Sequence, residues 1–145
     1  MYSVVPCAVQ NPDQSMLLPD KSGGRLSCVG GQETLASVML YSKHYDFLEC
    51  TSGKWKHDQE IVGSAYTPLA AECGQDCLVA DNGIVVRKEK KGDKDTIVVS
   101  CSGLAILLLN SKRYSTLECN FGNWRHENEE LASAFTPLPA VCEPR

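Results

Sequence analysis

The sequence predicts a mainly β protein that consists of two tandem, small, disulfide-stapled modules. Three observations support this fold class. The chain has 8 cysteines in 145 residues, its second half repeats its first half, and its apolar segments are short and separated by turn residues. Good helix formers gather at one place only, residues 126–134, so we expect little helix.

The cysteines read as a disulfide framework, because their number is even and no Cys-x-x-Cys metal motif is present. Such a framework is typical of secreted, extracellular proteins. Four cysteines in a module permit three pairings, so the sequence leaves the connectivity open. We expect pairing within modules, because duplication implies that each copy folds alone. The eight predicted disulfide residues are Cys7, Cys28, Cys50 and Cys73, then Cys77, Cys101, Cys119 and Cys142.

An internal repeat defines the modules. An offset of 69 places residues 35–73 on residues 104–142, with 20 identities in 39 positions. We therefore assign residues 1–73 to module 1 and residues 74–145 to module 2. Upstream of this block, Cys28 aligns with Cys101, and module 1 carries about four extra residues around positions 29–32. Residues 74–76 alone separate the two sets of cysteines, which implies a fixed or narrowly hinged pair.

The strands follow from β-branched and apolar runs that end in turn residues. In module 2 we expect a hairpin with strands at 83–87 and 96–101 and a charged turn at 88–95. Its module 1 counterpart is 15–18, a turn at 22–24, and a strand at 25–28. Residues 104–109 are apolar and fit either a buried strand or a helical turn. The equivalent residues 35–40 are similarly apolar. We expect further strands at 45–50 and 114–119, with turns at 52–53 and 121–122.

Two kinds of residue are candidates for binding. Trp55 and Trp124 follow a glycine turn at the same place in each module, and each is either a core residue or an exposed aromatic anchor. The core interpretation is the stronger one for so small a domain. Lys88, Lys90 and Lys91 form the one basic cluster, which contacts solvent or an anionic partner.

The sequence gives no reason to predict a catalytic, cofactor or metal site. The histidines His44, His57 and His126 do not supply the converging ligands that zinc requires. The acids Glu49, Glu60, Glu118 and Glu129 are repeated surface carboxylates, and nothing places them in a cleft as glycosidases require. No Gly-x-Ser-x-Gly motif is present, and disulfides account for every cysteine.

Charge and hydropathy limit the partners. The net charge of −4 argues against general nucleic-acid affinity, which needs a clustered positive face. The longest apolar run, residues 104–109, is too short to span a membrane. The first residues lack the basic start and long apolar run of a signal peptide, so we expect a mature chain.

Short motifs around the cysteines resemble the non-catalytic N-terminal domain of secreted arthropod DNA/RNA non-specific endonucleases. The matching blocks are Cys-x-Gly at residues 28–30 and 101–103, Cys-x-Ser-Gly at 50–53, and an aromatic-x-x-Leu stretch at 66–69 and 135–138. The resemblance implies an accessory region of such a nuclease or a relative that retains only these modules. The Asp-Arg-Gly-His motif, whose histidine activates water beside magnesium, is absent, so hydrolysis is not implied.

A weaker likeness concerns complement control (sushi) modules, which the chain resembles in having four cysteines and a Gly-x-Trp after the third. Residues 53–55 and 122–124 carry this motif. The spacing departs from that family, because 17 residues separate Trp55 from Cys73 and sushi modules close sooner.

We therefore expect a secreted, non-enzymatic interaction protein that binds an extracellular macromolecule, either a protein or a glycan. Two alternatives stay open. One is the accessory region of a secreted nuclease that lacks its catalytic domain. The other is an enzyme inhibitor that presents the exposed, disulfide-flanked loop at residues 29–34.

Overall fold

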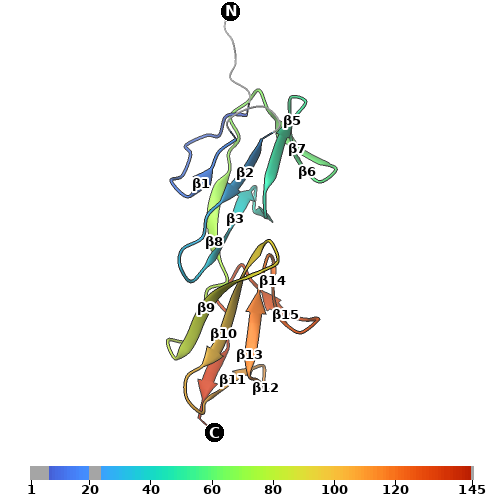
Figure 1. The fold of residues 1–145 in the computed structure, drawn as a ribbon. Helices are drawn as coiled ribbons and strands as arrows, with labels where there is room; N and C mark the ends of the chain where they lie inside the picture. Colours follow the sequence, from blue (N-terminus) through green and yellow to red (C-terminus); the bar gives the residue numbers. More distant parts are fainter. Residues whose placement is uncertain (1–6, 20–23, 145) are drawn as a thin grey trace, which may run out of the picture. The chain divides into compact units, whose positions relative to one another are not determined.

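The structure is a computed structural model that describes residues 7–19 and 24–144. All regular secondary structure in this part of the chain is β-strand, so the mainly β prediction is confirmed (Figure 1). None of the described residues forms a helix long and apolar enough to cross a membrane. The chain divides into two compact units, Met1–Val29 with Ala36–Gly74, and Gly30–Leu35 with Gln75–Arg145.

The first half of the chain forms two sheets, one with five strands and one with three. The five-stranded sheet has the order β1-β2-β5-β6-β7, and its strands are β1 (Met16–Leu17), β2 (Arg25–Cys28), β5 (Leu48–Thr51), β6 (Lys54–His57) and β7 (Glu60–Ser64). The three-stranded sheet has the order β4-β3-β8, with β4 (Lys43–Tyr45), β3 (Leu35–Leu40) and β8 (Glu72–Asp76).

Unit 2 contains the same two kinds of sheet in the same order. Its five-stranded sheet has the order β9-β10-β13-β14-β15, with β9 (Ile84–Lys91), β10 (Lys94–Cys101), β13 (Thr116–Cys119), β14 (Asn123–His126) and β15 (Glu129–Ser133). Its three-stranded sheet has the order β12-β11-β16, with β12 (Lys112–Tyr114), β11 (Ile106–Leu109) and β16 (Val141–Glu143). Residues aligned by the sequence repeat therefore occupy matching strands.

All eight cysteines form disulfides, and the pairing lies within modules as expected. The first cysteine pairs with the third and the second with the fourth: Cys7–Cys50, Cys28–Cys73, Cys77–Cys119 and Cys101–Cys142. The second-to-fourth bond joins the five-stranded sheet to the three-stranded sheet in each repeat, because β2 and β10 end at its first sulfur while β8 and β16 carry the other. Four disulfides are typical of extracellular proteins.

Each unit has its own hydrophobic core. In unit 1, Leu26, Leu48 and Trp55 are fully buried, and their partners in the repeat, Val99, Leu117 and Trp124, are fully buried in unit 2. Burial alternates along β11 and β13, as expected of strands with one face against a core. The segment 104–109 is therefore a turn followed by a buried strand, and the helical alternative is wrong.

The helical tendency at residues 126–134 is also overridden. His126 ends β14, and Glu129 begins β15 after a tight turn in which Glu127 has a φ of 56°. Trp124 lies opposite Ala132 across this hairpin, and Leu131 and Ala132 pack against the core. Tertiary pairing outweighs intrinsic propensity here, because propensity is worth only a fraction of a kcal/mol per residue.

Two boundaries differ from the sequence prediction. The charged turn expected at residues 88–95 contains only Gly92 and Asp93, since the ladder between β9 and β10 continues to Lys91 and Lys94. Lys90 lies opposite Asp95, which favours pairing, whereas the last pair of the ladder, Lys91 and Lys94, has like charges.

The single strands expected at 45–50 and 114–119 are each two strands in different sheets. Tyr45 ends β4 in the three-stranded sheet, and Leu48 begins β5 in the five-stranded one. In the module 1 hairpin, β1 and β2 form as expected, whereas Ser22 and Gly23 of its turn lie outside the described residues.

The carboxylate of Asp81 ties the start of unit 2 to its last strand. Its Oδ1 accepts a hydrogen bond from Gly83 N at 3.0 Å, and its Oδ2 accepts one from Cys142 N at 2.8 Å. These two backbone donors hold the pKa of Asp81 below its ordinary value of 3.8, because they stabilise the charged form. Module 1 has the neutral Asn11 at the equivalent position.

Removal of one sheet-to-sheet disulfide should destabilise its own unit. We expect Cys101→Ala/Cys142→Ala to lower the free energy of unfolding of unit 2 by about 2–5 kcal/mol, because the unfolded chain regains freedom. Urea denaturation followed by circular dichroism measures this, with Cys28→Ala/Cys73→Ala as the matched change in unit 1. Before that experiment, intact mass should fall eight hydrogens below the fully reduced mass. Four or more free thiols would contradict the assigned framework.

The Asp81 contacts predict an acid-sensitive term in the stability of unit 2. A carboxylate with a lowered pKa stabilises the folded state above the unfolded pKa, and this contribution is lost as the pH falls through the folded pKa. Asp81→Asn should therefore lower the urea midpoint at neutral pH, and the difference from wild type should shrink below about pH 4. Asp93→Asn, in the exposed turn, is the control. A difference that stays constant between neutral and acid pH would show that the charge of Asp81 contributes nothing.

Candidate interaction site

The two tryptophans belong to the cores and do not contact solvent. Both side chains are 0% exposed, and each lies opposite the third cysteine of its unit, as Cys50 with Trp55 and Cys119 with Trp124. The indole Nε1 atoms are buried without a hydrogen-bond acceptor among the described residues. The core interpretation therefore applies, and neither ring is an exposed anchor.

The predicted basic cluster is located on strand β9, and its charges are largely engaged. Lys91 Nζ forms an ion pair with the Glu118 carboxylate, and Lys88 Nζ donates to the Gly31 carbonyl at 3.0 Å. Lys90 lies opposite Asp95 in the ladder. Because acids and a backbone carbonyl accompany these lysines, they do not make a free cationic surface.

The loop at residues 29–34, considered above as an inhibitor loop, is exposed in part but fixed by polar contacts. Gly31 N donates to Thr34 Oγ1 at 2.9 Å, and Thr34 Oγ1 donates to Gln75 Oε1 at 2.6 Å. A Cβ at Gly30 would lie 2.3 Å from the Thr34 carbonyl oxygen, so the loop requires glycine there.

The candidate histidines and acids form no metal site within the described part of the chain. His44 Nδ1 lies 2.9 Å from Ser37 Oγ, and His126 Nδ1 lies 3.4 Å from the Thr116 carbonyl. The described residues contain no group of three or more His, Cys, Asp or Glu side chains that could hold a metal. Three of the four candidate acids form surface ion pairs, Glu49 with Arg25, Glu60 with Lys43 and Glu118 with Lys91. The fourth, Glu129, lines a cleft with Lys112.

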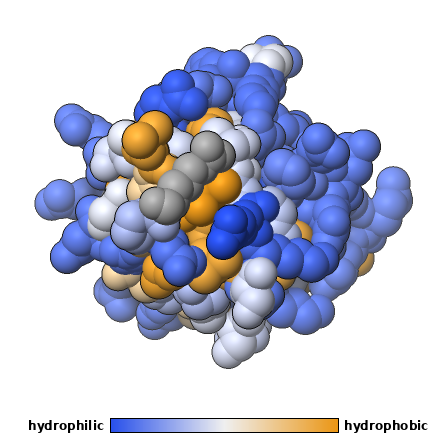
Figure 2. Space-filling model, turned by 90° about the horizontal axis from the view of Figure 1, so that it is seen from below, coloured by the Kyte–Doolittle hydropathy of each residue, from blue (hydrophilic) through white to orange (hydrophobic). Residues whose placement is uncertain are grey.

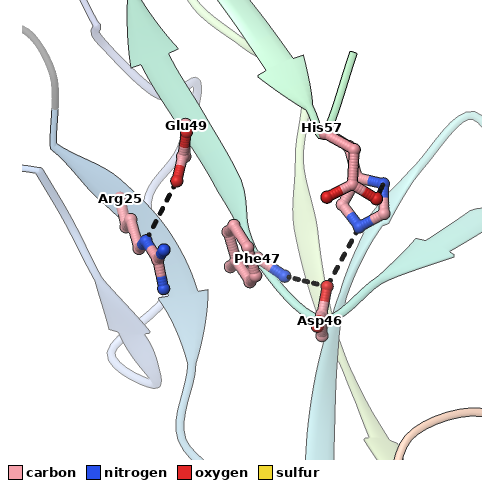
Figure 3. Close-up of polar contacts among 6 residues, drawn as sticks. Arg25, Asp46, Phe47, Glu49 and His57 are labelled. Atoms are coloured by element: carbon pink, nitrogen blue, oxygen red, sulfur yellow. Dashed lines mark hydrogen bonds and ion pairs between the residues drawn. The ribbon is translucent and has the colours of Figure 1, made fainter. Parts of the chain in front are cut away.

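A more distinctive arrangement lies on unit 1, where an arginine, an aromatic ring and acids meet (Figure 3). The Arg25 guanidinium carbon lies 4.1 Å from the centroid of the Phe47 ring. Arg25 Nε also donates to Glu49 Oε1 at 3.2 Å. A guanidinium over a ring face gains electrostatic attraction, and the adjacent carboxylate fixes its orientation.

His57 continues this arrangement beside Phe47. His57 Nε2 lies 3.1 Å from Asp46 Oδ1, the same oxygen that accepts a hydrogen bond from Phe47 N at 3.0 Å. The imidazole also lies 3.7 Å from the Asp58 carboxylate and 5.8 Å, between centroids, from the Phe47 ring. We call the set Arg25, Asp46, Phe47, Glu49, His57 and Asp58 the unit 1 polar cluster.

The unit 1 polar cluster remains open to solvent. The side chains of Arg25, Asp46 and Glu49 are 63%, 43% and 39% exposed, so polar atoms can reach a partner. Strands β2, β5 and β6 carry three of the six residues, and the neighbouring turns carry the others. The side chains are thus held by sheet backbone and by one another.

Unit 2 lacks three of the six side chains of this cluster and keeps an acid, Glu127, at the position of Asp58. The repeat aligns Asp46 with Ser115 and Phe47 with Thr116, and it aligns Arg25 with Val98. The equivalents of Glu49 and His57 are present, but Glu118 pairs with Lys91 from another strand. The arrangement of arginine, aromatic ring and acid is therefore specific to unit 1.

The sequence prediction missed Arg25, Asp46 and Phe47 as site residues. A comparison of the two modules at the positions where their residues differ in charge or size could have identified these three residues. We compared the positions that are identical in the two modules, and this comparison selects core residues such as the tryptophans. No family model, curated protein or solved structure matches this chain.

The unpartnered indole nitrogen predicts how the core responds to substitution. Trp124→Phe removes ring volume but no hydrogen bond seen in the structure, so we expect a loss of about 1–2 kcal/mol in the free energy of unfolding. Trp124→Ala leaves a cavity and should cost about 3–5 kcal/mol. Urea denaturation followed by circular dichroism compares the two, with Trp55→Phe as the match in unit 1. Equal losses for Phe and Ala would mean that the indole N–H makes an essential hydrogen bond.

Proposed function

We propose that this protein is a secreted, non-enzymatic interaction protein that binds an extracellular macromolecule through the unit 1 polar cluster. The observation that supports this proposal is that the cluster is exposed, ordered by its own contacts, and that its arginine, its aromatic ring and Asp46 have no equivalents in unit 2. A feature required only by the fold would recur in both units. The partner is a protein or a glycan.

The chemistry of the cluster suits binding. Arginine and aromatic side chains contribute most often to the energetic centres of protein interfaces. Because Arg25 and His57 are already held by Glu49 and Asp46, less side-chain entropy is lost on association than for free side chains. Exposed acids beside Arg25 allow hydrogen bonds to amide or hydroxyl donors of a partner.

An extracellular location is supported by the four disulfides, which reducing compartments would open. The resemblance to nuclease N-terminal domains gives the same surface a second proposed role, as an accessory region that engages a nuclease. Both roles require a partner bound by the oxidised fold, so the identity of that partner distinguishes them.

The repeat supplies matched substitutions that test the cluster. Asp46→Ser/Phe47→Thr introduces the residues that unit 2 carries at these positions, and a third change, Arg25→Gln, removes the guanidinium but keeps a polar side chain at this exposed position, because the equivalent Val98 is buried. We expect this triple variant to stay folded and to lose at least about tenfold in affinity for the partner, as is typical for removal of an interface centre. Extracellular fluid of the source organism is passed over immobilised wild-type and variant protein, and bound species are quantified by mass spectrometry.

Two controls make the result interpretable. The reverse change in unit 2, Ser115→Asp/Thr116→Phe, alters a similar surface and should leave binding unchanged. Reduced and alkylated protein should capture nothing that the oxidised fold captures specifically. If the triple variant retains its circular dichroism spectrum and captures the same partner at the same level, the unit 1 polar cluster is not the binding site.

A further inference from the structure

The three-stranded sheet of unit 2 presents an apolar outer face to solvent. Along β11, Leu107 and Leu109 point into the core and are 0% and 2% exposed, while Ile106 and Leu108 between them are half-buried on the other face. Val141 lies opposite Leu108 and is 45% exposed, and Leu104 in the preceding turn is 81% exposed. We call Leu104, Ile106, Leu108 and Val141 the unit 2 apolar face.

Figure 2 views the molecule from the end at which β11 and the last strand lie in Figure 1. Hydrophobic side chains gather there on one face, and hydrophilic side chains surround them (Figure 2). Contiguous exposed apolar surface of this kind, with a polar rim, is typical of protein interaction sites.

Module 1 has apolar residues at only two of the four equivalent positions, Leu35 and Met39. The positions equivalent to Ile106 and Val141 carry Ser37 and Glu72 in module 1, so module 2 is the more apolar of the two at matching places. The equivalent of Leu104 is Leu35, which is partly buried against the core of unit 2. The two equivalent leucines therefore differ, because Leu35 is partly buried and Leu104 is exposed.

Charged residues at the two edges of the unit 2 apolar face indicate what kind of surface would bind there. Arg113 on β12 lies in register with Leu108, and Glu143 on β16 lies in register with Ile106. Neither forms an ion pair within the described part of the chain. The sheet therefore carries a positive edge and a negative edge on either side of an apolar centre.

We propose that the unit 2 apolar face docks against the same face of a second copy of this chain, related by a two-fold axis parallel to β11. Such an axis places β12 of one copy over β16 of the other, so Arg113 of each copy approaches Glu143 of the other. The two residues are offset by two positions, about 7 Å along the strand, which long Arg and Glu side chains span. An isologous contact of this kind is self-complementary and closes at a dimer.

Sedimentation velocity of the full, oxidised chain tests the dimer. We expect wild type to pass from monomer to dimer between about 10 µM and about 1 mM, a range typical of modest interfaces. Leu104→Glu/Leu108→Glu should raise the dimer dissociation constant at least about tenfold, because Leu108 lies on the central strand and the change places four acids in the apolar centre of the dimer. Leu17→Glu, at a 57% exposed position on unit 1, is the matched control and should leave the dissociation constant unchanged.

A charge swap tests the specific orientation. Arg113→Glu alone should weaken the dimer, since it places like charges together, and Arg113→Glu/Glu143→Arg should restore wild-type association. Wild-type protein that stays monomeric up to about 1 mM overturns the proposal. So does a dimer that Leu104→Glu/Leu108→Glu leaves intact, or a charge swap that restores nothing. These outcomes do not depend on the unit 1 polar cluster, whose substitutions leave this face unchanged.

Discussion

The covalent bond between the second and fourth cysteine of each repeat joins two sheets that share no strand, and the rest of the structure depends on it. A unit of about 70 residues buries too little apolar surface for a generous stability margin. Cys28–Cys73 and Cys101–Cys142 hold the three-stranded sheet against the five-stranded one. The first-to-third bond ends at the third cysteine, which the sheet register places opposite the buried tryptophan. Two disulfides and one buried tryptophan therefore stabilise each small core.

With the core fixed in this way, the surface of each unit is free to differ. The residues that both repeats share include those that the two cores require, namely the cysteines, the tryptophans, and the tyrosines that end β4 and β12. The residues that differ gather into surfaces of opposite character. Unit 1 carries Arg25 over Phe47 beside acids, whereas unit 2 has Thr116 at the position of Phe47 and the buried Val98 at that of Arg25. Unit 2 instead exposes Leu104 and Val141.

The architecture could be predicted from the sequence because cysteine number, the repeat and β-branched runs are local or countable signals. Four features could not. The pairing of cysteines depends on which strands become neighbours, and the expected strand at 45–50 changes sheet after Tyr45, which no local pattern reveals. The helical tendency near Glu129 was outweighed by the hairpin that packs Leu131 on the core. The unit 1 polar cluster joins Arg25 to residues 21 to 33 positions later, and such contacts follow from the register of β2 with β5.

The two proposed surfaces lie on different units, which has a consequence for binding. A dimer closed through the unit 2 apolar face carries two copies of the unit 1 polar cluster. A partner with repeated epitopes, such as a glycan polymer or an oligomeric protein, would then meet two sites, and the second contact would form at the effective concentration set by the first. Modest single-site affinity suffices under those conditions, provided that the geometry allows both contacts at once. The self-complementary charges of Arg113 and Glu143 favour a closed pair over an open array, since an isologous contact uses up the face that forms it.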